Sequence, residues 1–179
     1  MPDQHEGAPP LYRASVPVFL AILDRIAAEL RRAEEALGEN YAAALERRPA
    51  DRMFPAAQQA ASSVQFMLRT AFPLVGLRPP EIRGELDGPG LMARIDEARR
   101  LLAGLDPAAF AGAETRIARG QAGFATVELP GEAFLFEFGL PNIYFHQAMA
   151  HVALKQAGAP LGKVDYDGRH DYPAGFSLG

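Results

Sequence analysis

The chain has 179 residues, of which 49% are hydrophobic and 22% charged, as is usual for a single globular domain. The net charge of −4 argues against a nucleic-acid-binding protein, and the absence of cysteine excludes disulfides, thiol nucleophiles and cysteine-ligated zinc. The sequence has neither the ~18 consecutive apolar residues of a membrane span nor the apolar core of a secretory signal, so we expect a cytoplasmic protein that binds no membrane.

The first predicted element is a long helix. Residues 1–13 are rich in proline and polar side chains and predict a flexible arm. Over residues 15–37, apolar side chains recur at steps of three and four, as on one face of an α-helix. Ser15 is the expected N-cap of this helix, and Gly38 follows its expected end.

A short helix is predicted at residues 40–47, and a second long helix begins near residue 51. The apolar stripe of the second helix continues to Pro73, which ends or kinks it. Phe66 lies roughly opposite that stripe. It either packs under the segment 40–47 or marks a contact with a second chain.

The middle of the chain predicts a loop, a helix and a hairpin. Residues 77–90 are rich in proline and glycine, as in a loop, and residues 90–104 carry a third helical stripe. Two short alternating runs, 115–119 and 124–129, predict a small β-hairpin joined by a glycine-containing turn.

The most apolar segment comes last. Two helical pieces, 131–139 and 141–157, are expected to meet at a kink at Pro141. Alternating phenylalanines in the first piece also fit a strand. From residue 159 onward, irregular structure is expected.

This pattern predicts an all-α fold, a four-helix bundle with a short extra helix and a small β-hairpin before the last helix. The long segment between the second and third helices, and the hairpin before the fourth, favour crossover connections. We expect an arm at 1–13, a bundle domain at 14–166 and an irregular tail at 167–179.

Histidine offers the best starting point for chemistry. At about 100° per residue, His146 and Asn142 share one largely apolar face of the last helix, and His151 lies about 140° from His146. We therefore expect His146 to point towards the core and His151 towards solvent. His146 is either a core histidine bonded to a carbonyl or hydroxyl, or part of a small polar ligand pocket with Asn142 and Tyr144.

The spacing of ligand-type residues argues against a metal. Two ligands on one helix face need a His-x-x-x-His spacing, but Ala150 stands four residues after His146. Between Pro55 and Pro79 the second long helix contains no His, Asp or Glu. We predict no metal site and no cofactor.

Arginine supplies nearly all the positive charge of the chain. Three arginine pairs, at 31–32, 47–48 and 99–100, lie beside acidic residues in helical patterns. They predict solvated helix faces with local ion pairs, and an anion site is the alternative.

Four strings carry a resemblance to a known family. They are Ala-Ser-Val-Pro-Val-Phe-Leu at 14–20, Met-Phe-Pro at 53–55, Leu-Pro-Asn-Ile-Tyr-Phe-His at 140–146 and Gly-Ala-Pro-Leu-Gly-Lys at 158–163. Over about residues 11–166 the chain resembles an uncharacterised bacterial domain-of-unknown-function family of the DinB/YfiT-like superfamily.

The resemblance implies a four-helix bundle, often dimeric. The wider superfamily includes enzymes with a three-histidine metal site, some of which transfer thiol cofactors. In those enzymes one histidine comes from the second helix and two come from a His-x-x-x-His on the last helix. This sequence lacks the histidine on the second helix and the His-x-x-x-His on the last helix. Of the three metal ligands, only one has a counterpart here, at His146.

Two functions therefore fit the sequence, which does not decide whether the protein is an enzyme. The first is a homodimeric binding module for a small molecule, with a polar pocket at His146, Asn142 and Tyr144. The second is a divergent metal-dependent transferase or hydrolase. A purely structural protein, with His146 fully packed and no pocket, is a third interpretation.

Overall fold

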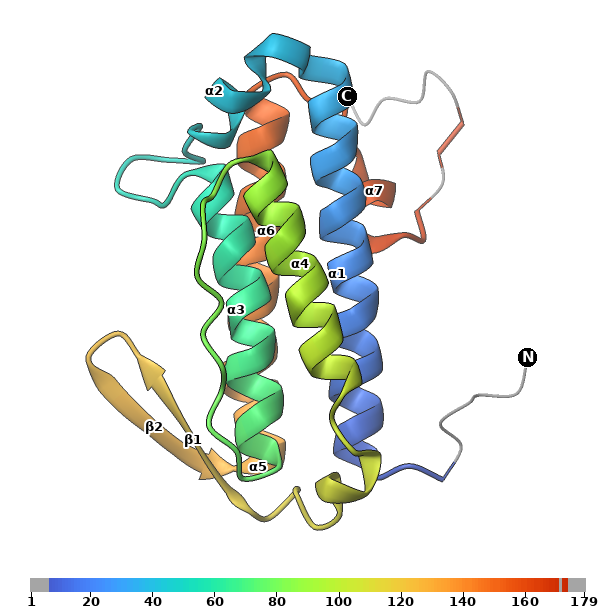
Figure 1. The fold of residues 1–179 in the computed structure, drawn as a ribbon, viewed down its shortest axis with the longest axis vertical. Coiled ribbons are helices and arrows are strands. Elements are labelled where there is room, and N and C mark those ends of the chain that lie inside the picture. Colours follow the sequence, from blue (N-terminus) through green and yellow to red (C-terminus); the bar gives the residue numbers. More distant parts are fainter. Residues whose placement is uncertain (1–6, 171, 174–179) are drawn as a thin grey trace.

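The computed structural model describes residues 7–170, 172 and 173, and the chain is mostly helical. The long helices α1 (Pro10–Leu37), α3 (Ala56–Leu74), α4 (Gly88–Ala103) and α6 (Leu140–Gln156) lie alongside one another (Figure 1). The shorter elements are α2 (Tyr41–Leu45), α5 (Gly131–Ala133), α7 (Lys163–Asp167), the 3-10 turns η1 (Gly38–Asn40) and η2 (Pro107–Phe110), and the π-helical turn η3 (Phe134–Gly139). Strands β1 (Ile117–Ala122) and β2 (Ala125–Pro130) form an antiparallel hairpin.

The apolar stripes of the long helices face one another and form the core. Phe19 of α1, Met67 of α3, Ile95 of α4 and Leu154 of α6 are all buried there. Removing such side chains from water is the main force that holds amphipathic helices together. None of the described helices is both long and apolar enough to span a membrane.

The connection between α3 and α4 is a crossover. Helices α3 and α4 run in the same direction, and the segment 75–87 returns along the length of α3 (Figure 1). The predicted crossover before the last helix is wrong, because α4 ends at the same end of the molecule where α6 begins. The hairpin projects from that end.

Helix α1 begins at Pro10, earlier than predicted. Leu11 and Tyr12 are buried and extend the apolar stripe, so residues 10–13 belong to the helix and not to a flexible arm. Ser15 is not an N-cap. It lies one turn inside the helix, where its hydroxyl donates to the carbonyl oxygen of Leu11 at 2.5 Å. Residues 1–6 of the expected arm lie outside the described part.

Three further boundaries differ from the prediction. Helix α3 starts at Ala56 because Pro55 before it is extended. The hairpin turn falls at residues 123–124, where Gly123 has a φ of +60°, a left-handed conformation that suits glycine. The tail, expected to be irregular from residue 159, contains α7, which packs against α1.

The segment before α6 is helical and contains no strand. Gly139 of η3 lies so close to α3 that an added Cβ would be 2.3 Å from Cγ2 of Thr70. Pro141 has no amide hydrogen, so a regular helical hydrogen bond to the residue four positions earlier cannot form there. Next to it, the side-chain amide of Asn142 donates to the carbonyl oxygen of Phe138, four residues earlier, at 2.6 Å. Most of the predicted first piece, Phe134–Gly139, is a wide π-turn that leads directly into α6, in place of a simple kink at Pro141.

Candidate functional site

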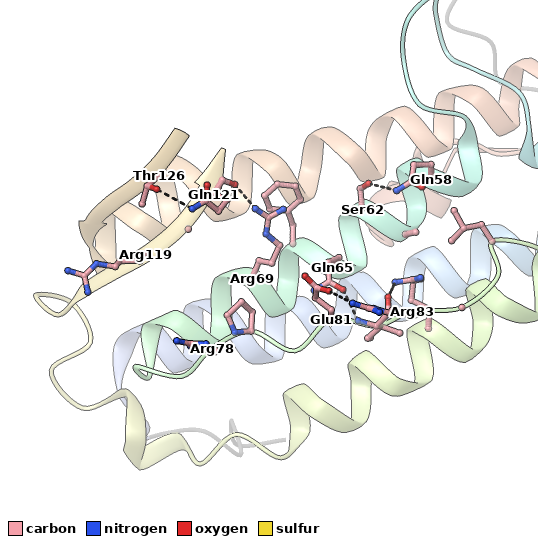
Figure 2. Close-up of a pocket in the computed structure, with 18 residues that line it drawn as sticks. Gln58, Ser62, Gln65, Arg69, Arg78, Glu81, Arg83, Arg119, Gln121 and Thr126 are labelled. Atoms are coloured by element: carbon pink, nitrogen blue, oxygen red, sulfur yellow. Dashed lines mark hydrogen bonds and ion pairs between the residues drawn. The ribbon is translucent and has the colours of Figure 1, made fainter. Parts of the chain in front are cut away.

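A cavity of about 1080 Å³ lies over α3, between the segment 75–87 and the β-hairpin. Figure 2 shows its labelled residues arriving from α3, from that segment and from the hairpin. We call this cavity the α3 groove. It is lined by Gln58, Ala61, Ser62, Gln65, Phe66, Arg69, Arg78, Pro79, Glu81, Ile82, Arg83, Gly84, Leu86, Arg94, Arg119, Gly120, Gln121 and Thr126.

One wall of the α3 groove is fixed by Gln65. Its side-chain nitrogen donates to the carbonyl oxygen of Pro80 at 2.8 Å, and its Oε1 accepts from the amide of Ile82 at 3.1 Å. Arg94 of α4 donates through Nη1 to the carbonyl oxygen of Ile82 at 2.5 Å. These bonds satisfy backbone groups of a proline-rich segment that has no secondary structure of its own. They therefore set the position of this wall.

The other wall is the hairpin, which Arg69 ties to α3. The Arg69 guanidinium donates through Nη2 to the carbonyl oxygen of Gln121 (Figure 2). Its Cζ also lies 4.6 Å from the ring centroid of Phe66, within cation–π range. The Gln121 side chain donates to Oγ1 of Thr126 at 3.1 Å across the hairpin. The groove thus has an aromatic floor beside a positive charge.

The charged side chains that line the α3 groove are mostly positive. There are five arginines, and Glu81 is the one carboxylate among the lining residues. Burial lowers the pKa of Arg69 and of Arg94, because a desolvated guanidinium loses hydration. The residue Arg94 is only 8% exposed, and its Nε is a buried polar atom without a hydrogen-bond partner among the described residues.

His146 lies at the seam between α6 and α3, half-buried. Its Nδ1 is 2.7 Å from Oε1 of Gln59, and its ring stacks on Phe66 with centroids 5.4 Å apart. Burial, and secondarily the charge of Arg69, lowers the pKa of His146, which favours the neutral ring. Its partner is a side-chain amide of α3, and neither the backbone carbonyl nor the hydroxyl that we expected.

The predicted pocket residues do not line the α3 groove. Asn142 is half-buried and bonds within its own turn, and Tyr144 is 40% exposed. Phe66 is the link between the two regions, because it lines the groove and also contacts His146. Phe66 packs on Phe138 as well, and not under the short helix that follows α1.

The prediction that His151 faces solvent is wrong. Its side chain is 13% exposed, and its Nδ1 lies 2.7 Å from Oε1 of Glu29, a residue of α1 that is itself buried. The ring of Tyr166 meets the His151 ring edge-on at 5.9 Å. Burial raises the pKa of Glu29 more than the bond and charge of His151 lower it.

The face of α6 that is actually buried explains both histidines. Ile143, Gln147 and Leu154 form its centre. His146 and His151 lie on opposite edges of this face, one against α3 and the other against α1.

The three-histidine metal site of the wider superfamily does not fit this chain. Gln59, and not a histidine, meets His146 from the second long helix, and Ala150 stands where a His-x-x-x-His would place its second ligand. Within the described ranges, no group of three or more His, Cys, Asp or Glu side chains is arranged to hold a metal ion.

The arginine pairs of the sequence are not the arginines of the groove. Arg99 pairs with Asp24 at 2.7 Å and with Asp96 at 2.6 Å, as expected for a solvated helix face. Arg100 likewise pairs with Glu97. The five groove arginines stand singly along the chain and form no run, so sequence reasoning missed them. Proline and glycine crowding at 77–90 was the one available signal for this wall.

One comparison with known proteins gives the family of the chain, and another gives a solved structure with a similar fold. A family model described as a domain of unknown function (DUF1993) matches residues 11–167. A crystal structure of a DinB family member from Shewanella denitrificans is similar, with a TM-score of 0.80 and 28% sequence identity. That similarity covers 92% of this chain and 95% of the other. No curated protein matches the sequence.

Proposed function

Because the chain belongs to the DUF1993 family, a family defined without a function, we propose from its site that it is a small-molecule-binding module. The ligand occupies the α3 groove. The observation that carries this proposal is the cavity itself, about 1080 Å³, with polar and aromatic side chains converging on it from three parts of the chain.

The architecture of the walls supports a ligand site that exists before binding. Gln65 and Arg94 hold the segment 75–87, and Arg69 holds the hairpin. A cavity held by side-chain hydrogen bonds loses little conformational entropy when it is filled. His146 has a supporting role in this proposal, because it backs Phe66 from the side of α6.

The proposal includes a cytoplasmic homodimer. Three exposed aromatic side chains support self-association. Phe136 of η3 is 49% exposed, and in α6 Tyr144 is 40% and Phe145 is 50% exposed. Exposed aromatic groups of this size favour interfaces. Light scattering coupled to gel filtration tests it: a dimer for the native chain and a monomer for Phe136→Ser/Phe145→Ser are expected. A monomeric native chain contradicts the dimer and leaves the ligand proposal standing.

The competing function, a divergent metal-dependent transferase or hydrolase, finds no supporting donor set among the described residues. Gln59 and Ala150 occupy the places that would complete the site around His146. We therefore derive no chemical step for this chain.

A ligand screen with a blocked groove tests the binding proposal. Ligand-observed NMR with a few hundred chemically diverse fragments is expected to find binders. Ser62 lies half-buried in the groove wall, so Ser62→Trp fills the cavity and should abolish that binding. Ser62→Ala removes the same hydroxyl without filling the cavity and should keep it. Binding that survives Ser62→Trp, or a screen without binders, contradicts the proposal.

A further inference from the structure

We infer that the ligand of the α3 groove is a small organic anion that presents a phosphate or carboxylate group to its arginines. This inference rests on the proposed binding function and names the chemical class of the ligand. It stands on three observations: the sign of the charges in the groove, an orphaned buried guanidinium atom, and the mixture of charged and apolar walls.

The charges in the groove are opposite in sign to the charge of the chain. The whole chain carries a net charge of −4, whereas five arginines and one glutamate line the groove. Like charges held around one cavity repel each other, and a bound anion relieves that repulsion. A surface that served only solubility would mix both signs.

The groove arginines are also poorly neutralised. Glu81 lies 3.5 Å from Arg83, and both side chains are well exposed, so this pair is screened by water. Arg119 pairs with Glu128 of the hairpin. Arg69, Arg78 and Arg94 make no ion pair within the part of the chain that the structure describes. Arginines on the outer face of α4, in contrast, pair closely with carboxylates, as Arg99 does with Asp24.

Arg94 supplies an independent pointer to a ligand. It is buried, it lines the groove, and its Nη1 is used by the carbonyl oxygen of Ile82. Its Nε is buried without a hydrogen-bond partner among the residues described. Buried polar atoms are nearly always satisfied, so this guanidinium, which lines the groove and lacks one of its hydrogen bonds, is short of acceptors. An anion in the groove supplies one to its accessible edge. An oxyanion is the acceptor that guanidinium groups bind best.

The remaining walls indicate an organic body attached to the anion. Phe66, Pro79 and Leu86 contribute apolar surface beside the arginines. A cavity of about 1080 Å³ is at the upper end of the range for small-molecule sites, of order 300–1,000 Å³, and is far larger than one inorganic phosphate needs. The ligand therefore combines a charged head with a larger uncharged part.

Calorimetry with a matched set of sugars tests the inference. The probes are glucose 6-phosphate, glucuronate and glucose, which share a pyranose ring and carry a phosphate, a carboxylate or a hydroxyl at C6. We expect one or both anions to bind and glucose to bind at least about tenfold more weakly. The phosphate and carboxylate arms identify which head the site prefers. Added salt should weaken the binding of the anion, because salt screens the attraction between the anion and the exposed arginines.

Variants on the exposed rim connect the effect to this groove. Arg78→Gln/Arg83→Gln removes two positive charges from side chains for which the described structure shows no hydrogen bond to the backbone. It should lower the affinity for the anion about tenfold or more. Glu81→Gln removes the groove's carboxylate and should strengthen binding about two- to fivefold. Arg31→Gln/Arg47→Gln also removes two positive charges, from exposed arginines outside the groove, and should leave the affinity unchanged.

Two different results separate failure of the inference from failure of the proposed function. If neither anion binds more tightly than glucose, or if the rim variants leave the affinity unchanged, the anionic class is wrong. If fragments bind the native chain but not Ser62→Trp, the proposed binding function would still stand. If neither sugars nor fragments depend on the groove, both the function and the ligand class are wrong.

Discussion

Replacing His151 with leucine tests how the buried carboxyl group of Glu29 is stabilised. Glu29 is 3% exposed, and its Oε1 lies 2.7 Å from Nδ1 of His151. In the described part of the chain, no other side-chain hydrogen bond to Glu29 is present. His151→Leu fills a similar volume but leaves that oxygen buried without a donor.

The cost depends on whether Glu29 is ionised. Removing one partner of a buried pair costs about 3–5 kcal/mol when the remaining group stays charged. Glu29 limits this cost because it can take up a proton, at about 1.4 kcal/mol per unit of increase in its pKa. We therefore expect a loss of about 2–4 kcal/mol at pH 8. The loss should be smaller at pH 5, because burial raises the pKa of Glu29 and increases its protonated fraction there, and a neutral hydrogen bond is worth only about 1 kcal/mol.

Urea unfolding, followed by circular dichroism at pH 5 and pH 8, measures the change in the free energy of unfolding. The protein concentration is held fixed, because the stability of a dimer depends on concentration. Glu29→Gln provides the matched background, since glutamine accepts the same bond from Nδ1 and cannot ionise. In that background His151→Leu should cost about 1 kcal/mol at both pH values. Equal losses at pH 5 and pH 8 in the Glu29 background would refute the reasoning, because the charge of Glu29 would then play no part.

The remaining predictions concern pH, packing and metal. Burial raises the pKa of Glu29 in the folded chain above its ordinary value of 4.5, so the unfolded chain releases this proton at a lower pH. The contribution of Glu29 to stability should therefore fall as the pH rises from 4.5 through the folded pKa. Glu29→Gln should remove this dependence of the unfolding midpoint on pH, and an unchanged dependence contradicts the prediction. Gly139→Ala places a Cβ 2.3 Å from Cγ2 of Thr70 and should cost about 1–3 kcal/mol, whereas Gly104→Ala, with its nearest contact at 3.4 Å, should change stability by less than about 1 kcal/mol; similar thermal midpoints for both variants would count against this account. Mass spectrometry of protein purified without chelator should find no stoichiometric Zn, Ni, Mn or Fe, and one metal per chain that is lost in His146→Ala would revive the enzyme hypothesis.

The helices were the most predictable part of the fold, because their stripes extend over many turns. Phe19 and Met67 occupy the predicted core faces of α1 and α3 and are fully buried. Short or irregular elements were not predictable in this way. Helix α7 has five residues, too few for a periodic pattern, and η3 depends on the close approach of Gly139 to α3.

The α3 groove could not be found from the sequence. The five groove arginines are separated by 5 to 25 residues and share no motif: Arg69, Arg78, Arg83, Arg94 and Arg119. They meet because the segment 75–87 returns along α3 and the hairpin projects beside it. The loop was predictable from its prolines and glycines, but its path is set by the bonds of Gln65 and Arg94.

The two histidines of α6 show most directly what each level decides. The sequence by itself determined the angle between His146 and His151, since helical geometry turns about 100° per residue. It did not determine where the core lies around that angle, because apolar residues such as Phe145 also occupy the outer side of α6 and remain half-exposed. Packing of α6 against both α1 and α3 set that direction. It brought His151 to Glu29 on one side and His146 to Gln59 on the other.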